Sequence, residues 1–176
     1  SIDVLMAKKY LPAHDAGLYT ALSTLGKIIY FAPLSIATAL FPYISQTNTQ
    51  SQRLNLLKKA LLMVCAVVVI ALIFYFTCPN LIFTILFGQK YSFDYILLGY
   101  MGLALGVVGI VQLLINYLLA HRGWWYMFAL AISAIIQFFA YTIFHQNINQ
   151  IVYVTLACSC IMLFLVSCSL FRTEKI

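Results

Sequence analysis

The stretch AGLYTALSTLGKIIYFAPLSIATALFPYIS, residues 16–45, decides the fold class of this chain. Its apolar run is long enough to cross a bilayer, because a spanning helix needs about 20 predominantly apolar residues. It nevertheless holds a lysine, Lys27, and a proline, Pro33, well inside its ends. The sequence therefore predicts a membrane helix and raises the question of what a charge and a helix breaker do inside it.

The composition of the whole chain supports a membrane protein. Hydrophobic residues make up 64% of the 176 residues, charged residues make up 8%, and the mean hydropathy is +1.00. A soluble fold of this size would lack the polar groups that it needs to cover its surface. The formal charge of +6 comes from basic residues that stand mainly at the ends of apolar runs, which is typical of membrane topology. We therefore expect an integral membrane protein that binds no nucleic acid.

Polar clusters divide the chain into an N-terminal stub and five spans. No segment shows the ten-residue alternation of a membrane β-barrel, so the predicted fold class is an all-α, polytopic transmembrane helix bundle. The spans are predicted near 17–45, 58–78, 95–120, 125–144 and 150–171, after a stub near 1–9. The chain starts without a methionine and its first apolar stretch is short, so we expect it to be a fragment of a longer protein.

Basic residues concentrate in alternate connections between the spans. The connections and the tail predicted to be cytoplasmic carry Arg53, Lys58, Lys59, Arg122, Arg172 and Lys175. The two intervening connections carry only Lys90. Because lysine and arginine favour the cytoplasmic side, the C-terminus is predicted to be cytoplasmic. Lys8 and Lys9 then lie on the outer side, where they either anchor the stub at the head groups or attract an anionic ligand.

Two local patterns predict architecture rather than chemistry. The span near 95–120 carries glycines at spacings of three and four, which places them on one helix face that a neighbour approaches closely. These residues are Gly99, Gly102, Gly106 and Gly109. The segment NLIFTILFGQKY, residues 80–91, is too short to span, and we expect a partial helix at the outer interface that ends at Gly88 and is held by Tyr91.

Lys27 and Asp3 are the strongest candidates for a functional site. An ionised side chain at the centre of a bilayer costs at least about 2.5 kcal/mol, so it usually faces a partner or a wet cavity. Asp3 is expected at a similar depth on the neighbouring antiparallel helix. Lys27 either pairs with Asp3, or reaches back to the membrane surface, or lines a water-filled cavity with Lys8 nearby and attracts a phosphate-bearing substrate.

Four further residues complete the candidate list. Pro33 removes a backbone donor and is predicted to kink the helix and act as a hinge. Gln112 and Asn116 lie one helical turn apart, and Gln137 lies on the next span. These amides either line the same cavity or form hydrogen-bonded pairs between helices.

The sequence offers little for catalysis. Its four acidic residues and three histidines are dispersed, so no nucleophile, base and orienting acid converge. The five cysteines form no CxxC pair and show no metal-ligand spacing with histidine. We therefore expect no enzyme activity, no metal site and no cofactor.

The order of short motifs resembles a known family. A near-span acid is followed by GLYT (17–20), ALFPYIS (39–45), a basic linker, ILFGQKYSF (85–93) and a span that ends in an arginine-containing turn. This order is similar to the C-terminal half of the polysaccharide and O-antigen flippases, in the multidrug/oligosaccharidyl-lipid/polysaccharide exporter superfamily. The resemblance implies that residues 1–176 form the second six-helix lobe of a two-lobe transporter, with its first helix truncated and an N-terminal lobe of the same chain as partner.

The resemblance also implies a function. Such flippases move an undecaprenyl-pyrophosphate-linked oligosaccharide, a polysaccharide or O-antigen repeat unit, across the bacterial inner membrane by alternating access. Asp3, Lys8 and Lys27 would then border the passage, while membrane lipids and polysaccharide synthesis proteins are further expected partners. Two alternatives remain open: a cation-coupled multidrug exporter of the same superfamily, and a non-transporting scaffold that holds polysaccharide synthesis enzymes together.

Overall fold

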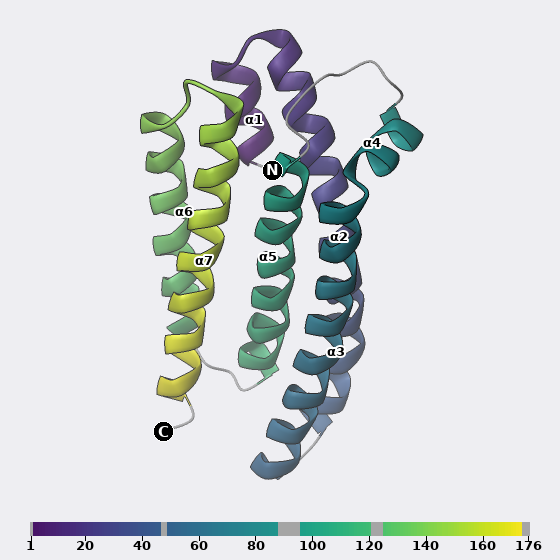
Figure 1. The fold of residues 1–176 in the computed structure, drawn as a ribbon. Helices are drawn as coiled ribbons and strands as arrows, with labels where there is room; N and C mark the ends of the chain where they lie inside the picture. The colour runs from purple at the N-terminus through teal and green to yellow at the C-terminus, as the bar shows by residue number, and fades with distance from the viewer. Residues whose placement is uncertain (1, 47–48, 88–95, 121–124, 174–176) are drawn as a thin grey trace.

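The structure, a computed structural model, describes residues 2–46, 49–87, 96–120 and 125–173. Within these ranges it contains seven helices and no strand, so the all-α fold class is confirmed for the described part of the chain. Figure 1 shows how these helices are arranged. The helices are α1 (Ile2–Tyr10), α2 (Ala13–Gln46), α3 (Gln50–Thr77), α4 (Pro79–Phe87), α5 (Ile96–Ala120), α6 (Trp125–Ile143) and α7 (Ile148–Thr173).

Five of these helices are long and apolar enough to cross a membrane, which makes the chain a multi-pass membrane protein. Their candidate spans are Ala13–Ala39, Gln50–Thr77, Ile96–Ala120, Tyr126–Ile143 and Ile148–Leu170. The bounds differ most from the predicted ranges at α3, which begins eight residues before position 58. This difference arises because the basic linker is already helical from Gln50 onward.

The long helices alternate in direction, so their connections fall at two opposite ends of the bundle (Figure 1). Helices α2, α5 and α7 run from the upper to the lower end of that view, and α3 and α6 return. The lower end therefore collects the start of α3, with Arg53, Lys58 and Lys59, and the end of α7. Arg122, Lys90, Lys175, Gly88 and Tyr91 lie outside the described residues.

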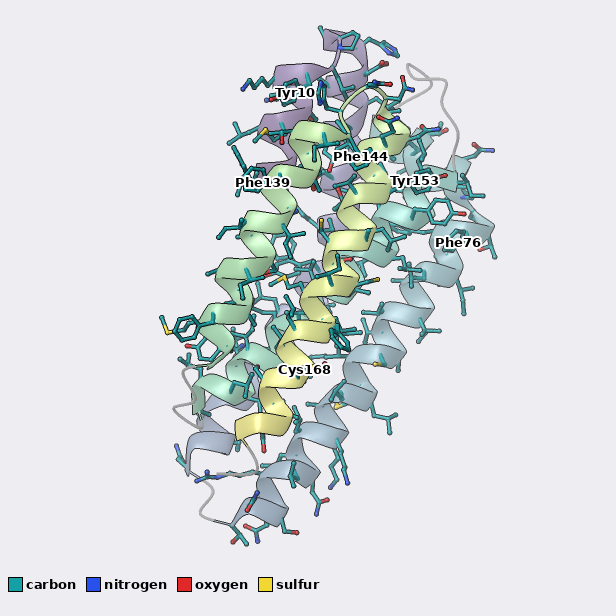
Figure 2. The ribbon with its side chains drawn as sticks, turned by 90° about the vertical axis from the view of Figure 1, so that its left-hand side faces the viewer. Tyr10, Phe76, Phe139, Phe144, Tyr153 and Cys168 are labelled. Atoms are coloured by element: carbon teal, nitrogen blue, oxygen red, sulfur yellow. The ribbon has the colours of Figure 1, made fainter. Side chains whose placement is uncertain are left out.

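Two short helices lie toward the upper end of the bundle. Helix α4 follows α3 directly and spans nine residues, which confirms a short helix in the segment predicted from residue 80. Helix α1 precedes α2, and the ring of Tyr10 at its end stacks on His145, with 4.2 Å between the ring centroids. Figure 2 shows Tyr10 close to the connection between α6 and α7, so this contact joins α1 to that connection.

Helix α5 lies at the centre of the packing and contacts α2, α3 and α7. Its glycine stripe, defined as Gly99, Gly102, Gly106 and Gly109, is buried and meets Phe76, Tyr75, Val68 and Pro33 in that order. The predicted packing role of these glycines is thereby confirmed. Because these glycines have no side chains, the α5 backbone approaches α2 and α3 closely. The close approach increases van der Waals contact, which matters in a membrane because lipid tails are as apolar as the helices and no hydrophobic force drives the helices together.

Helix α2 runs without interruption from Ala13 to Gln46, through Pro33 and Pro42. Pro33 has no N–H group, so the carbonyl of Ile29 lacks its usual helical donor. Pro33 is buried, and a Cβ atom added to Gly109 would lie 2.7 Å from Pro33 Cγ. The predicted hinge therefore lies in a continuous helix at a close contact with α5, and its bending stays a prediction.

We expect Gly109→Ala to destabilise the bundle, because the rigid pyrrolidine ring of Pro33 has little freedom to move away from a new methyl group. Overpacking of this kind costs about 1–3 kcal/mol. The midpoint of thermal unfolding should then fall by about 2–12 °C, measured in detergent by circular dichroism.

The matched control for Gly109→Ala is Ala66→Leu, which enlarges an exposed position on α3. Its midpoint should stay within about 2 °C of the parent protein. Equal midpoints for the two variants would contradict the close packing of α5 on Pro33.

Candidate functional site

A cavity of about 300 Å³ lies among α1, α2, α5, α6 and α7. Its wall contains apolar side chains of α5, including Leu105 and Val108, and polar side chains from the other four helices. The polar lining residues are Asp3, Lys27, Ser133, Gln137, Thr155 and Ser159. Helices α6 and α7, which carry four of them, form the near face of the bundle in Figure 2.

A simple repeat brings these polar residues together. On three helices, polar residues recur every fourth position, so each set follows one helix face. The sets are Tyr19, Ser23 and Lys27 on α2, Ser133, Gln137 and Tyr141 on α6, and Thr155 and Ser159 on α7. The three polar faces converge on one region of an otherwise apolar bundle.

Asp3 is the buried carboxylate of this region, with a side chain that is 8% exposed. Its Oδ2 atom accepts hydrogen bonds from the Tyr19 hydroxyl at 3.3 Å and from Ser23 Oγ at 3.1 Å. Both donors are fully buried residues of α2. Two hydrogen bonds to a buried carboxylate offset part of its desolvation, so Asp3 fixes α1 against α2.

The hydrogen bonds continue from Tyr19 to α7 and α6. The Tyr19 hydroxyl lies 3.2 Å from Thr155 Oγ1, and the Tyr141 hydroxyl lies 2.9 Å from the same atom. Gln137 Nε2 donates to the Tyr141 hydroxyl at 3.1 Å. The resulting Asp3 network, defined as Asp3, Tyr19, Ser23, Gln137, Tyr141 and Thr155, joins α1, α2, α6 and α7.

Lys27 lies one helical turn after Ser23, about 6 Å farther along α2. It is half-buried and lines the same cavity as Asp3. No ion pair joins Lys27 to Asp3, whose bonded oxygen is held instead by the neutral donors Tyr19 and Ser23. The ion pair between Lys27 and Asp3 considered from the sequence is therefore not formed. Each of the two charged side chains lines the cavity without contacting the other.

Three of the other predicted residues lie away from this cavity. Lys8 is exposed on α1, while Gln112 and Asn116 are half-buried on α5, and none of the three is among the lining residues. Gln112 stands one turn beyond Val108, about 6 Å farther along the helix than the part of α5 that reaches the cavity. Gln137 does line the cavity, as one of the two interpretations of the amides predicts.

Comparisons of the chain with protein-family models, curated proteins and solved structures gave no match. The chemistry of the cavity therefore has to be inferred from the residues of this chain.

Sequence reasoning missed most of the Asp3 network and two serines of the cavity wall. These residues are Tyr19, Ser23, Ser133, Tyr141, Thr155 and Ser159. The signal that would have found them is the fourth-residue repeat of hydroxyl and amide side chains within apolar helices, read on three helices together. Serine and threonine are common in membrane helices, so each helix alone carries a weak signal.

The described lining residues limit the chemistry of the cavity. They include one carboxylate, one ammonium group, three aliphatic hydroxyl groups, one amide and the thiol of Cys158. Across the described ranges, no group of three or more histidine, cysteine, aspartate or glutamate residues is placed to hold a metal ion. This set suits binding by charge and hydrogen bonds.

We expect Tyr19→Phe to destabilise the protein, because it removes a buried hydroxyl that contacts both Asp3 and Thr155. Leaving a buried carboxylate short of one donor costs about 1–3 kcal/mol. Thermal unfolding in detergent should show a clear fall in midpoint. Tyr30→Phe is the matched control on the same helix, since Tyr30 lies outside the Asp3 network. A midpoint for Tyr19→Phe as high as that of Tyr30→Phe would argue against the network.

Proposed function

We propose that the protein moves an undecaprenyl-pyrophosphate-linked oligosaccharide across the bacterial inner membrane by alternating access. The observation that carries this proposal is a half-buried lysine, Lys27, without an ion-pair partner on Asp3, at a cavity that five further polar side chains line within a bundle of spanning helices. A charge in this setting marks a wet site for a ligand. Lysine is a common point-charge partner of phosphate groups.

The proposed substrate has a charged head and an apolar tail, and the bundle offers surfaces for both. The pyrophosphate is attracted to Lys27 inside the cavity. The prenyl chain stays among the lipids, against exposed apolar side chains such as Phe139 of α6, which Figure 2 labels, and Phe164 of α7. This division keeps the charged group out of hydrocarbon while the tail never leaves it.

The proposed transport cycle depends on the Asp3 network and on the missing backbone hydrogen bond at Pro33. The Asp3 network joins α1, α2, α6 and α7 around the cavity, so these helices move together there. The missing backbone hydrogen bond at Pro33 provides the place where α2 bends. In this proposal residues 1–176 act as the C-terminal lobe, paired with an N-terminal lobe of the same chain, and the end that carries Arg53, Lys58 and Lys59 faces the cytoplasm.

We expect Lys27→Ala to abolish surface polysaccharide in cells that depend on this protein, because the pyrophosphate loses its charged partner. Surface polysaccharide is measured by gel electrophoresis and staining, and membrane levels of the protein by immunoblot. Lys58→Ala is the matched control, since Lys58 is exposed on α3 and far along the chain from the cavity wall. Normal polysaccharide from a Lys27→Ala protein that reaches the membrane would refute the proposed role.

Removing one charge separates transport from a scaffold role. A scaffold needs only a folded bundle, so Lys27→Gln, which leaves the Asp3 network intact, should support polysaccharide synthesis if the protein is a scaffold. The transport proposal predicts that this variant is inactive, because the phosphate loses its charged partner. Activity of Lys27→Gln, with normal membrane levels, would favour the scaffold.

A second candidate function is cation-coupled export of drugs, and Asp3 is the observation that favours it. A buried carboxylate that lines a cavity suits a coupling cation. Our proposal predicts that expressing the protein leaves the accumulation of ethidium in cells unchanged. Lower accumulation that is lost in Asp3→Asn would favour the exporter instead.

A further inference from the structure

Three hydroxyl groups on the cavity wall share one feature: each donates its proton to a backbone carbonyl about one turn earlier on its own helix. The pairs are Ser133 Oγ with the Leu130 carbonyl at 2.9 Å, Thr155 Oγ1 with the Ile151 carbonyl at 2.7 Å, and Ser159 Oγ with the Leu156 carbonyl at 2.7 Å. A hydroxyl has one proton to donate and lone pairs to accept. Once the proton is used within the helix, the oxygen offers the cavity an acceptor.

The three hydroxyls are not equally available. Thr155 Oγ1 accepts a hydrogen bond from the Tyr141 hydroxyl and lies 3.2 Å from the Tyr19 hydroxyl, so protein groups already surround it. Ser133 and Ser159 contact no other side chain within hydrogen-bond distance among the described residues. Their oxygens remain open to a ligand.

Asp3 adds a stronger acceptor to the same wall. Both of its protein donors bind Oδ2, which leaves Oδ1 without a donor among the described residues. We name Asp3, Ser133 and Ser159 the acceptor wall. Lys27 differs from the acceptor wall, because it is the positively charged residue among the described lining residues. The cavity therefore selects a ligand that donates hydrogen bonds to one part and carries an anion at another.

We propose that the cavity binds a single neutral, hydroxyl-rich sugar unit together with the phosphate attached to it. The phosphate binds Lys27, and sugar hydroxyl groups donate to the acceptor wall. This inference rests on the proposed function and names the part of the substrate that the cavity binds. The volume of about 300 Å³ lies at the lower end of ligand-site volumes, which suits one sugar ring rather than a whole oligosaccharide.

The acceptor wall also predicts what the cavity rejects. A sugar that bears a carboxylate presents a second anion and further acceptors to Asp3. The sugar carboxylate and the Asp3 carboxylate repel each other in a medium of low dielectric constant. They also form no hydrogen bond, because neither of them has a proton to donate. A uronic acid next to the phosphate should therefore bind poorly, although its size is close to that of the neutral sugar.

The test is isothermal titration calorimetry on the protein in lipid nanodiscs, with inorganic phosphate, glucose 1-phosphate and glucuronic acid 1-phosphate as probes. We expect glucose 1-phosphate to bind about tenfold more tightly than inorganic phosphate, because its hydroxyls add hydrogen bonds to the acceptor wall. Glucuronic acid 1-phosphate should bind about tenfold more weakly than glucose 1-phosphate. Asp3→Asn should remove most of this second difference.

The serines are tested by the double variant Ser133→Ala with Ser159→Ala. It should reduce the affinity for glucose 1-phosphate about fivefold to tenfold and leave the affinity for inorganic phosphate unchanged. Ser169→Ala is the matched control, because Ser169 on α7 donates to the Val166 carbonyl in the same way but does not line the cavity. Its affinities should equal those of the parent protein.

The outcomes separate this inference from the proposed function. Equal binding of the neutral and acidic sugar phosphates, or equal behaviour of the double variant and Ser169→Ala, would overturn the acceptor wall alone, provided that Lys27→Ala still weakens phosphate binding. Phosphate binding that Lys27→Ala leaves unchanged would overturn the proposed function. No binding of any probe would overturn both.

Discussion

The structure depends on one constraint: in lipid, a buried carboxylate must find its hydrogen-bond donors within the protein. Asp3 satisfies it through Tyr19 and Ser23, and Tyr19 passes the contact on to Thr155. Each such bond contributes only about 0.6 kcal/mol in a membrane protein. Their joint effect is geometric, since hydrogen bonds are directional and lipid exerts no hydrophobic force to hold α1, α2, α6 and α7 in register.

The opposite side of the bundle is held by a different interaction. There the glycine stripe brings α5 against α2 and α3, with Tyr75 donating across to the Leu25 carbonyl at 2.8 Å. Dispersion forces at this contact need only close approach and no partner chemistry. The molecule thus combines a densely packed side with a polar side, and the cavity lies where the polar side leaves room.

Long apolar runs made the fold predictable, and the position of Lys27 made part of the site predictable. Helix length and the glycine spacing follow from the chain alone, because both are local properties of one helix. The partners of Asp3 were not predictable in this way. Whether a carboxylate pairs with Lys27 or with Tyr19 and Ser23 depends on how α1 is rotated against α2, and α1 is too short for periodicity to fix that rotation. The amides Gln112 and Asn116 show the same limit, since their distance along α5 from the cavity depends on how far the helices slide past each other.

The contact between Pro33 and Gly109 has a mechanical consequence. The ring of Pro33 packs directly on the backbone of Gly109, so α2 cannot bend toward α5 at that point without displacing it. Val108 neighbours Gly109 in the chain and lines the cavity. A deflection of the lower half of α2 would therefore displace α5 and, with it, the Val108 side chain at the cavity wall.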